Sequence, residues 1–76
     1  MLDGARCRAI REDQALTLQE LADMVSESLG APVSESTICK WELGRRQPTP
    51  KRFRALCEAL NVAKEDLLVA QKVEAA

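Results

Sequence analysis

Apolar side chains recur along the chain at intervals of three and four residues, the spacing of one helix face. The clearest such stretch is residues 18–29, whose apolar positions are Leu18, Leu21, Ala22, Val25 and Leu29. Thr17 and Glu20 stand at its start with the spacing of a capping box, in which each side chain accepts a hydrogen bond from the other residue's amide. Gly30 fits the left-handed residue that ends a helix. The sequence therefore predicts a helix over residues 18–29.

A second, shorter helix is predicted over about residues 34–43. Ser34 is its N-cap, and Gly44 follows its last residue. Ile38 and Trp41 are three residues apart, so they share a face and form the buried side of this helix.

Three further helices complete the pattern. They cover residues 3–13, residues 49–61 and a segment that begins at about residue 64. In the first of them, Ile10 and either Cys7 or Arg6 mark the inner side. No stretch alternates in the manner of a strand. The predicted fold class is all-α, a compact five-helix bundle that forms one domain over residues 1–76.

The net charge of the chain hides an uneven distribution. Its 76 residues are 46% hydrophobic and 30% charged, as in ordinary globular domains, and the net charge is −1. Residues 12–39 carry six acidic and no basic side chains, whereas residues 40–54 carry six basic side chains and one acidic one. An acidic chain can thus present one positive face, which is what a phosphate backbone senses. The same charges would also serve merely to solvate the helices, and charge alone does not decide.

Several classes of protein are not expected. No apolar run approaches the roughly 20 residues of a membrane span, and the N-terminus does not resemble a secretion signal, so a cytoplasmic protein is expected. The sequence has no histidine, and its three cysteines come from separate segments, which predicts neither a disulfide framework nor a metal site: Cys7, Cys39 and Cys57. Cys7 and Cys57 are expected to be small core residues. No grouping suggests a catalytic base or nucleophile, so neither an enzyme nor a cofactor is expected.

Residues 17–44 have the form of a helix-turn-helix unit, which places its second helix in the DNA major groove. Such a unit needs apolar inner faces, short polar side chains at the start of the second helix, and nearby amides and basic residues for phosphates. Residues 17–46 provide all three features.

Three strings of the chain resemble the Cro/C1-type (Xre-like) helix-turn-helix domains of phage repressors and bacterial regulators. These strings are LTLQELADMV, VSESTICKWELGRRQPTP and ALCEALNVAKEDLL, and the resemblance extends over roughly residues 8–68. It implies a bundle of the lambda-repressor-like type that binds double-stranded DNA. The chain departs from the family in the turn between its second and third helices, which is about four residues longer. It also has Ala63 where a capping serine or threonine is common.

The resemblance also assigns roles to residues. It implies base contacts by Glu35, Ser36, Thr37 and Lys40. It implies phosphate contacts by Thr17, Gln19, Arg45, Arg46 and Lys51. It implies an ion pair between Arg11 and Glu42 that ties the first helix to the third. The chemistry agrees, because lysine can donate to guanine and glutamate can accept from cytosine. Glu35 would equally stabilise the start of its helix, and the basic side chains would equally be solvated surface residues.

The motifs and the resemblance suggest two alternative functions. The first is a sequence-specific transcriptional regulator, a repressor that binds a symmetric operator as a homodimer, with half-sites about one helical turn apart. Residues 68–73 are the expected dimer segment. The second is a protein-interaction module, such as an antitoxin, whose main contact is a partner protein.

Overall fold

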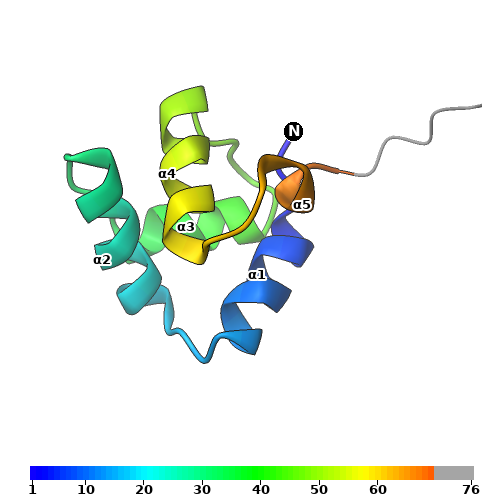
Figure 1. Cartoon of the computed structure of the whole chain (residues 1–76), viewed down its shortest axis with the longest axis horizontal. Coiled ribbons are helices and arrows are strands. Elements are labelled where there is room, and N and C mark those ends of the chain that lie inside the picture. Colours follow the sequence, from blue (N-terminus) through cyan, green and yellow to red (C-terminus); the bar gives the residue numbers. More distant parts are fainter. Residues whose placement is uncertain (70–76) are drawn as a thin grey trace, which may run out of the picture.

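Five helices in a computed structural model make up the fold (Figure 1), and the structure describes residues 1–69. They are α1 (Gly4–Asp13), α2 (Leu18–Leu29), α3 (Glu35–Glu42), α4 (Pro50–Leu60) and α5 (Lys64–Leu67). Over residues 1–69 there is no strand, so the all-α class is confirmed. The first four helices lie where the sequence predicts them.

Side-chain caps set the start of each long helix. The side-chain oxygens of the four N-cap residues each accept a hydrogen bond from the amide three residues further on: Asp3, Thr17, Ser34 and Thr49. Such caps satisfy amides that have no partner inside the helix. Ala63 has no side-chain oxygen to cap the start of α5, and the Asp66 carboxylate accepts from the Ala63 amide at 3.1 Å. The missing side-chain cap at Ala63 is therefore partly replaced by the Asp66 carboxylate, one turn further along the helix.

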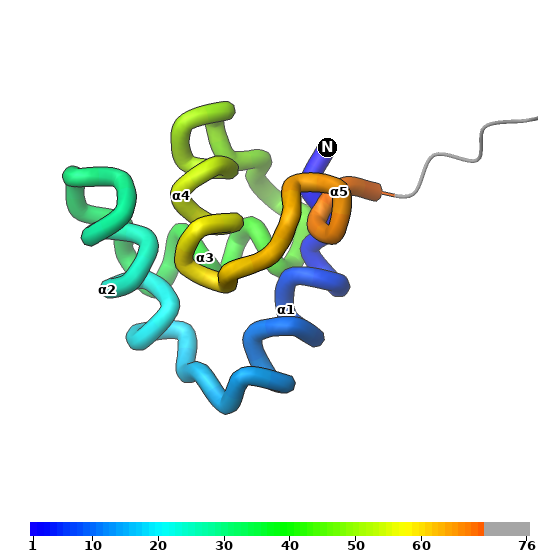
Figure 2. The backbone as a smooth tube through the Cα atoms, viewed as in Figure 1, coloured from blue at the N-terminus to red at the C-terminus, as the bar shows by residue number. Residues whose placement is uncertain are grey.

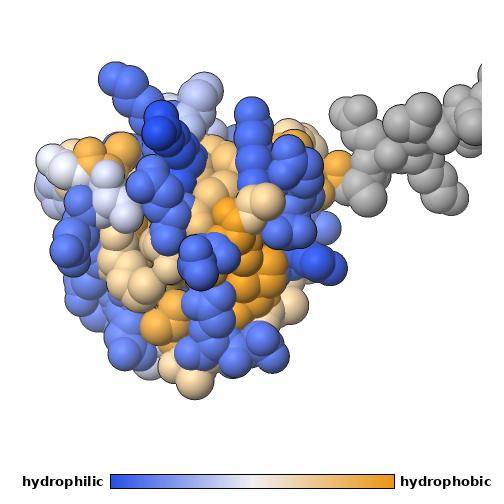
Figure 3. Space-filling view, in the orientation of Figure 1, coloured by the Kyte–Doolittle hydropathy of each residue, from blue (hydrophilic) through white to orange (hydrophobic). Residues whose placement is uncertain are grey.

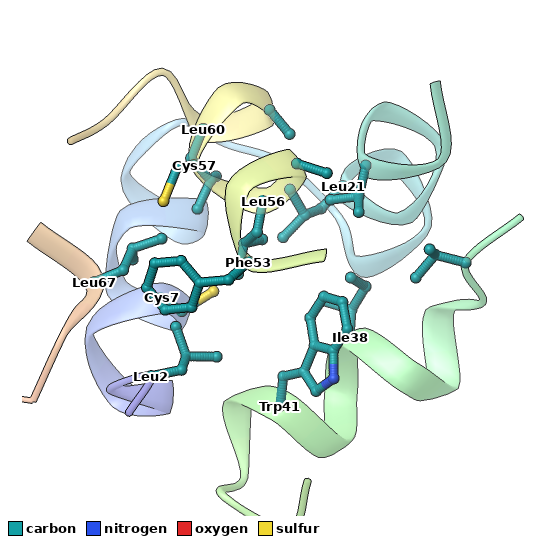
Figure 4. Packing of buried hydrophobic residues seen from close by; sticks show 14 of the residues in the cluster. Leu2, Cys7, Leu21, Ile38, Trp41, Phe53, Leu56, Cys57, Leu60 and Leu67 are labelled. Carbon is teal, nitrogen blue, oxygen red and sulfur yellow. The ribbon is translucent and has the colours of Figure 1, made fainter. Parts of the chain in front are cut away.

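Helix α4 lies at the centre of the core. Six of its residues are buried: Phe53, Ala55, Leu56, Cys57, Ala59 and Leu60. Ile38 and Trp41 point from α3 toward this cluster, as their spacing predicts (Figure 4). Cys7 is buried on α1 and Arg6 is exposed, so Cys7 is the residue on the inner side of that helix. Burial raises the pKa of the Cys7 thiol to about 12, which keeps it protonated as a core residue.

The N-terminal segment pairs with the chain that leaves α5, a contact that no sequence pattern predicts. The Asp3 amide donates to the Leu67 carbonyl at 2.7 Å, and the Val69 amide donates to the Met1 carbonyl at 2.9 Å. The two segments run side by side in Figure 2. Helix α5 ends at Leu67, because Leu68 has an extended backbone and takes part in this pairing. Of the expected dimer segment, residues 70–73 lie outside the described residues.

Several apolar side chains remain partly exposed around the core. They are Ile10, Leu16, Leu18, Met24, Leu29, Val62 and Leu68. Figure 3 shows apolar surface gathered at the centre of one face, with hydrophilic side chains around it. Helix α3 passes behind α4 in the same view (Figure 1).

Gly4 allows the start of α1 to approach the end of α3. A Cβ at this position would come within 2.5 Å of the Trp41 carbonyl oxygen and closer still to that of Glu42. Backbone atoms cannot move away as a flexible side chain would, so only glycine fits between the two helices here.

Replacing Gly4 with alanine should therefore lower the free energy of unfolding by about 1–3 kcal/mol, the usual cost of overpacking. Helix propensity alone predicts the opposite sign, because alanine favours a helix over glycine. Thermal and urea unfolding measure the change. The neighbouring exposed Ala5→Gly is the control, with a loss of no more than about 1 kcal/mol from propensity. A Gly4→Ala variant more stable than the wild type would contradict the close approach.

Candidate nucleic-acid interface

The outer side of α3 carries the residues that were predicted to contact bases. Glu35, Ser36 and Lys40 are exposed, while Ile38 and Trp41 fix the opposite side in the core. The helix is therefore held by its apolar face and presents short or charged polar side chains to solvent. This arrangement suits an element that docks by its outer face.

Thr37 is placed differently from the other three. It is half-buried, its amide donates to the Ser34 hydroxyl at 3.2 Å, and its hydroxyl lies 3.0 Å from the same oxygen. The Thr37 hydroxyl is thus part of the N-cap of α3. The structure shows this capping role of Thr37, whereas its contact with a base stays a prediction.

A serine supports the long turn between α2 and α3, and sequence reasoning missed it. The turn spans residues 30–34 and begins with Gly30 in the left-handed conformation, at φ 77°. The Ser26 hydroxyl accepts from the Val33 amide at 2.8 Å and lies 2.7 Å from the Ala22 carbonyl, to which it can donate. Val33 is itself buried. The long turn is therefore held against the protein by the Ser26 hydrogen bonds and by the buried Val33 side chain, which fixes the start of α3.

A basic loop follows α3 directly. Gly44 has φ 74° and turns the chain, and the Arg45 amide donates to the Lys40 carbonyl at 2.9 Å. Arg45 and Arg46 are both exposed beside the end of α3, and Lys51 is exposed in the first turn of α4. Positive charge therefore gathers at one end of α3, although the chain as a whole is slightly acidic.

The start of α2 provides two more polar groups. The Thr17 hydroxyl accepts from the Glu20 amide at 3.0 Å, which leaves the hydroxyl proton free to donate to a phosphate oxygen. The Gln19 side-chain nitrogen donates to Asp23 at 2.9 Å and is held along the helix. Both side chains are exposed. Thr17 combines a structural role with an available donor, while Gln19 would have to share or release its bond to Asp23.

Arg11 and Glu42 form a two-point ion pair between α1 and α3. Arg11 Nε donates to Glu42 Oε2 at 2.7 Å, and Nη2 donates to Oε1 at 3.2 Å. The remaining Nη1 donates to the Leu16 carbonyl at 2.8 Å, just before α2 begins. The side chains are only 11% and 5% exposed. This one guanidinium therefore joins α1, the entry to α2 and the end of α3.

The fold and this surface together define a helix-turn-helix DNA-binding domain. The model of the helix-turn-helix family matches residues 8–67, most of the chain. The chain belongs to the Cro/C1-type helix-turn-helix family.

One solved structure with the same fold is the restriction-modification controller protein C.AhdI from Aeromonas hydrophila. The match has a TM-score of 0.67 and 22% sequence identity, and it covers 86% of this chain and 89% of that one. At this identity the match shows the shared fold. No curated protein matches the chain in sequence.

Residues 1–69 contain neither a membrane-spanning helix nor a cluster of metal ligands. None of the helices found there is long and apolar enough to cross a membrane. Within the same residues, no three side chains of His, Cys, Asp or Glu come together in a way that could hold a metal ion. The buried side-chain nitrogen and oxygen atoms of the described chain all have hydrogen-bond partners.

Removing one partner of the Arg11–Glu42 pair should strongly destabilise the fold. Glu42→Gln should lower the free energy of unfolding by about 3 kcal/mol, because the Arg11 charge stays nearly buried without its counter-ion. The matched control is Glu12→Gln, which breaks the exposed Arg8–Glu12 pair and should cost less than about 1 kcal/mol. Equal losses in the two variants, measured by urea unfolding, would rule out the bridging role of Arg11.

The cap of α2 should be sensitive to acid. Hydrogen bonding from Thr17 lowers the pKa of Glu20 below its ordinary value, so folding favours the ionised carboxylate. This contribution is present above the ordinary pKa of glutamate and is lost as pH falls through the lowered value. Glu20→Gln should therefore be less stable than the wild type at pH 7, with the gap closing as the pH falls below the ordinary pKa of glutamate. Thermal melts across pH measure it, and the exposed Glu27→Gln in the same helix should show no such closing gap.

Proposed function

We propose that the chain is a sequence-specific transcriptional regulator, a repressor that binds a symmetric operator as a homodimer. Residues on the outer side of α3 read base edges, and the basic loop after α3 holds the phosphate backbone. The observation that carries the proposal is the exposure of Glu35, Ser36 and Lys40 on a helix whose other face is fixed in the core. Such a regulator acts without enzymatic activity and in the cytoplasm, where its DNA lies.

The proposed contacts divide by chemistry. Lys40 donates to guanine O6 and N7, Glu35 accepts from cytosine N4, and Ser36 suits several base edges. Thr37 adds a contact from the edge of the same helix. The phosphate contacts come from Thr17, Gln19, Arg45, Arg46 and Lys51. These phosphate contacts position the domain, and the base contacts select the sequence.

Dimer binding follows from the small size of the surface. One recognition helix of eight residues reaches few base pairs, and a second copy on the other half-site supplies the missing affinity and specificity. Two-fold symmetry of the protein then requires a symmetric operator. Residues 68–73 are proposed as part of the dimer contact, of which Leu68 is half-buried and Val69 exposed.

Selection of bound sequences from random duplex DNA tests the proposal directly. The expected result is an inverted repeat whose half-sites are about 10 base pairs apart, centre to centre. Affinity for that site should fall steeply with salt, because bound phosphates release counter-ions. Enrichment of no sequence, or binding that ignores salt, would contradict the proposed function.

Single substitutions should separate base contacts from phosphate contacts. Lys40→Ala should cost about 1–3 kcal/mol of binding and relax selection at one position of each half-site. Arg45→Ala should weaken all duplexes alike and reduce the salt slope by about one per subunit. Titration with labelled duplex at several salt concentrations measures both effects.

The matched control is Lys64→Ala, since Lys64 is also an exposed cation, lies at the start of α5 and is not among the proposed DNA contacts. Unchanged DNA binding in Lys40→Ala and Arg45→Ala would favour a module whose main contact is a partner protein.

A further inference from the structure

The outer side of α3 carries a large apolar side chain that the proposed contacts leave unused. Leu43 follows Ser36 by seven residues and Lys40 by three, so the three side chains share the side of the helix away from the core. Leu43 is 58% exposed. Only Met1 and Val69 are comparable among the described residues, and both lie at the ends of the described chain.

Cys39 extends the apolar surface around Leu43. It precedes Leu43 by four residues, which makes the two side chains neighbours on the helix. Its thiol is free and half-exposed, and a free thiol behaves as a small hydrophobic group with a weak donor. Cys39 and Leu43 together form an apolar strip beside Lys40.

The chemistry of the strip limits what it can contact in DNA. Leucine can neither donate to a phosphate nor accept from a base amine. The edges that bases present in the major groove are donors and acceptors, except for the C5 methyl group of thymine and ring C–H atoms. An apolar side chain on a helix that enters this groove therefore gains most where it covers that methyl group.

We infer that the apolar strip of Cys39 and Leu43 contacts a thymine methyl group in the half-site, beside the base that Lys40 contacts. This inference rests on the proposed function and deepens it, because it names a base that the site should contain. Leu43 would then determine specificity in addition to the polar residues of α3.

The test removes the methyl group without changing base pairing. Thymines of the selected half-site are replaced one at a time by deoxyuridine, which differs only in lacking that methyl. Binding of the wild-type protein should weaken about fourfold at one thymine, the value expected for one buried methyl group, and stay unchanged at the others.

Variants of Leu43 connect this effect to the strip. Leu43→Ala should bind the thymine and uracil duplexes equally, whereas Leu43→Met keeps an apolar side chain and should retain the preference for thymine. Val62→Ala, a partly buried apolar residue between α4 and α5 that has no proposed contact, is the control and should retain the wild-type preference for thymine. Because Leu43 is exposed, the variants should keep the wild-type melting temperature.

The outcomes separate this inference from the proposed function. Specific binding with no sensitivity to uracil, or a selected half-site without thymine, overturns the inference and leaves the proposed function standing. A preference for thymine that persists unchanged in Leu43→Ala also overturns it. If no duplex is preferred at all, the proposed function fails and the inference fails with it.

Discussion

The side chain of Arg11 sets the geometry on which the candidate DNA surface depends. Its guanidinium holds Glu42 at the end of α3 and the Leu16 carbonyl at the entry to α2. The guanidinium, a rigid and planar group on α1, therefore fixes the positions of both helices of the helix-turn-helix unit relative to α1. A lysine could not replace it, because a single ammonium cannot hold a carboxylate at two points and a carbonyl in fixed directions.

Local sequence signals were sufficient to predict most of the fold. Caps such as Thr17 with Glu20, the left-handed Gly30 and the spacing of Ile38 and Trp41 act within a few residues, and each was confirmed. Contacts between distant segments could not be predicted in this way. The bond from Gln14 to the Leu60 carbonyl and the pairing of Leu2 with Leu68 join residues far apart in the chain. No periodic pattern marks such pairs.

The candidate site was predictable only in part, for a related reason. The resemblance gave the positions on α3, and the structure shows Glu35, Ser36 and Lys40 exposed there. The resemblance could not predict how the longer turn is held. The Ser26 hydroxyl that bridges to Val33 lies where this chain departs from the family pattern. Leu43 was missed because the resemblance assigns DNA contacts to polar residues only, and its 58% exposure is known only from the structure.

The three cysteines differ in their surroundings in a way that gives the protein a built-in chemical reporter. Cys7 has no exposed surface and Cys57 is 8% exposed, while Cys39 is half-exposed on α3. A thiol reagent added to the folded protein therefore reaches Cys39 first and reaches Cys7 only after unfolding. Its rate of modification reports whether α3 is covered, and the number of fast-reacting thiols reports whether the chain is folded. The natural sequence thus allows both measurements without an introduced label.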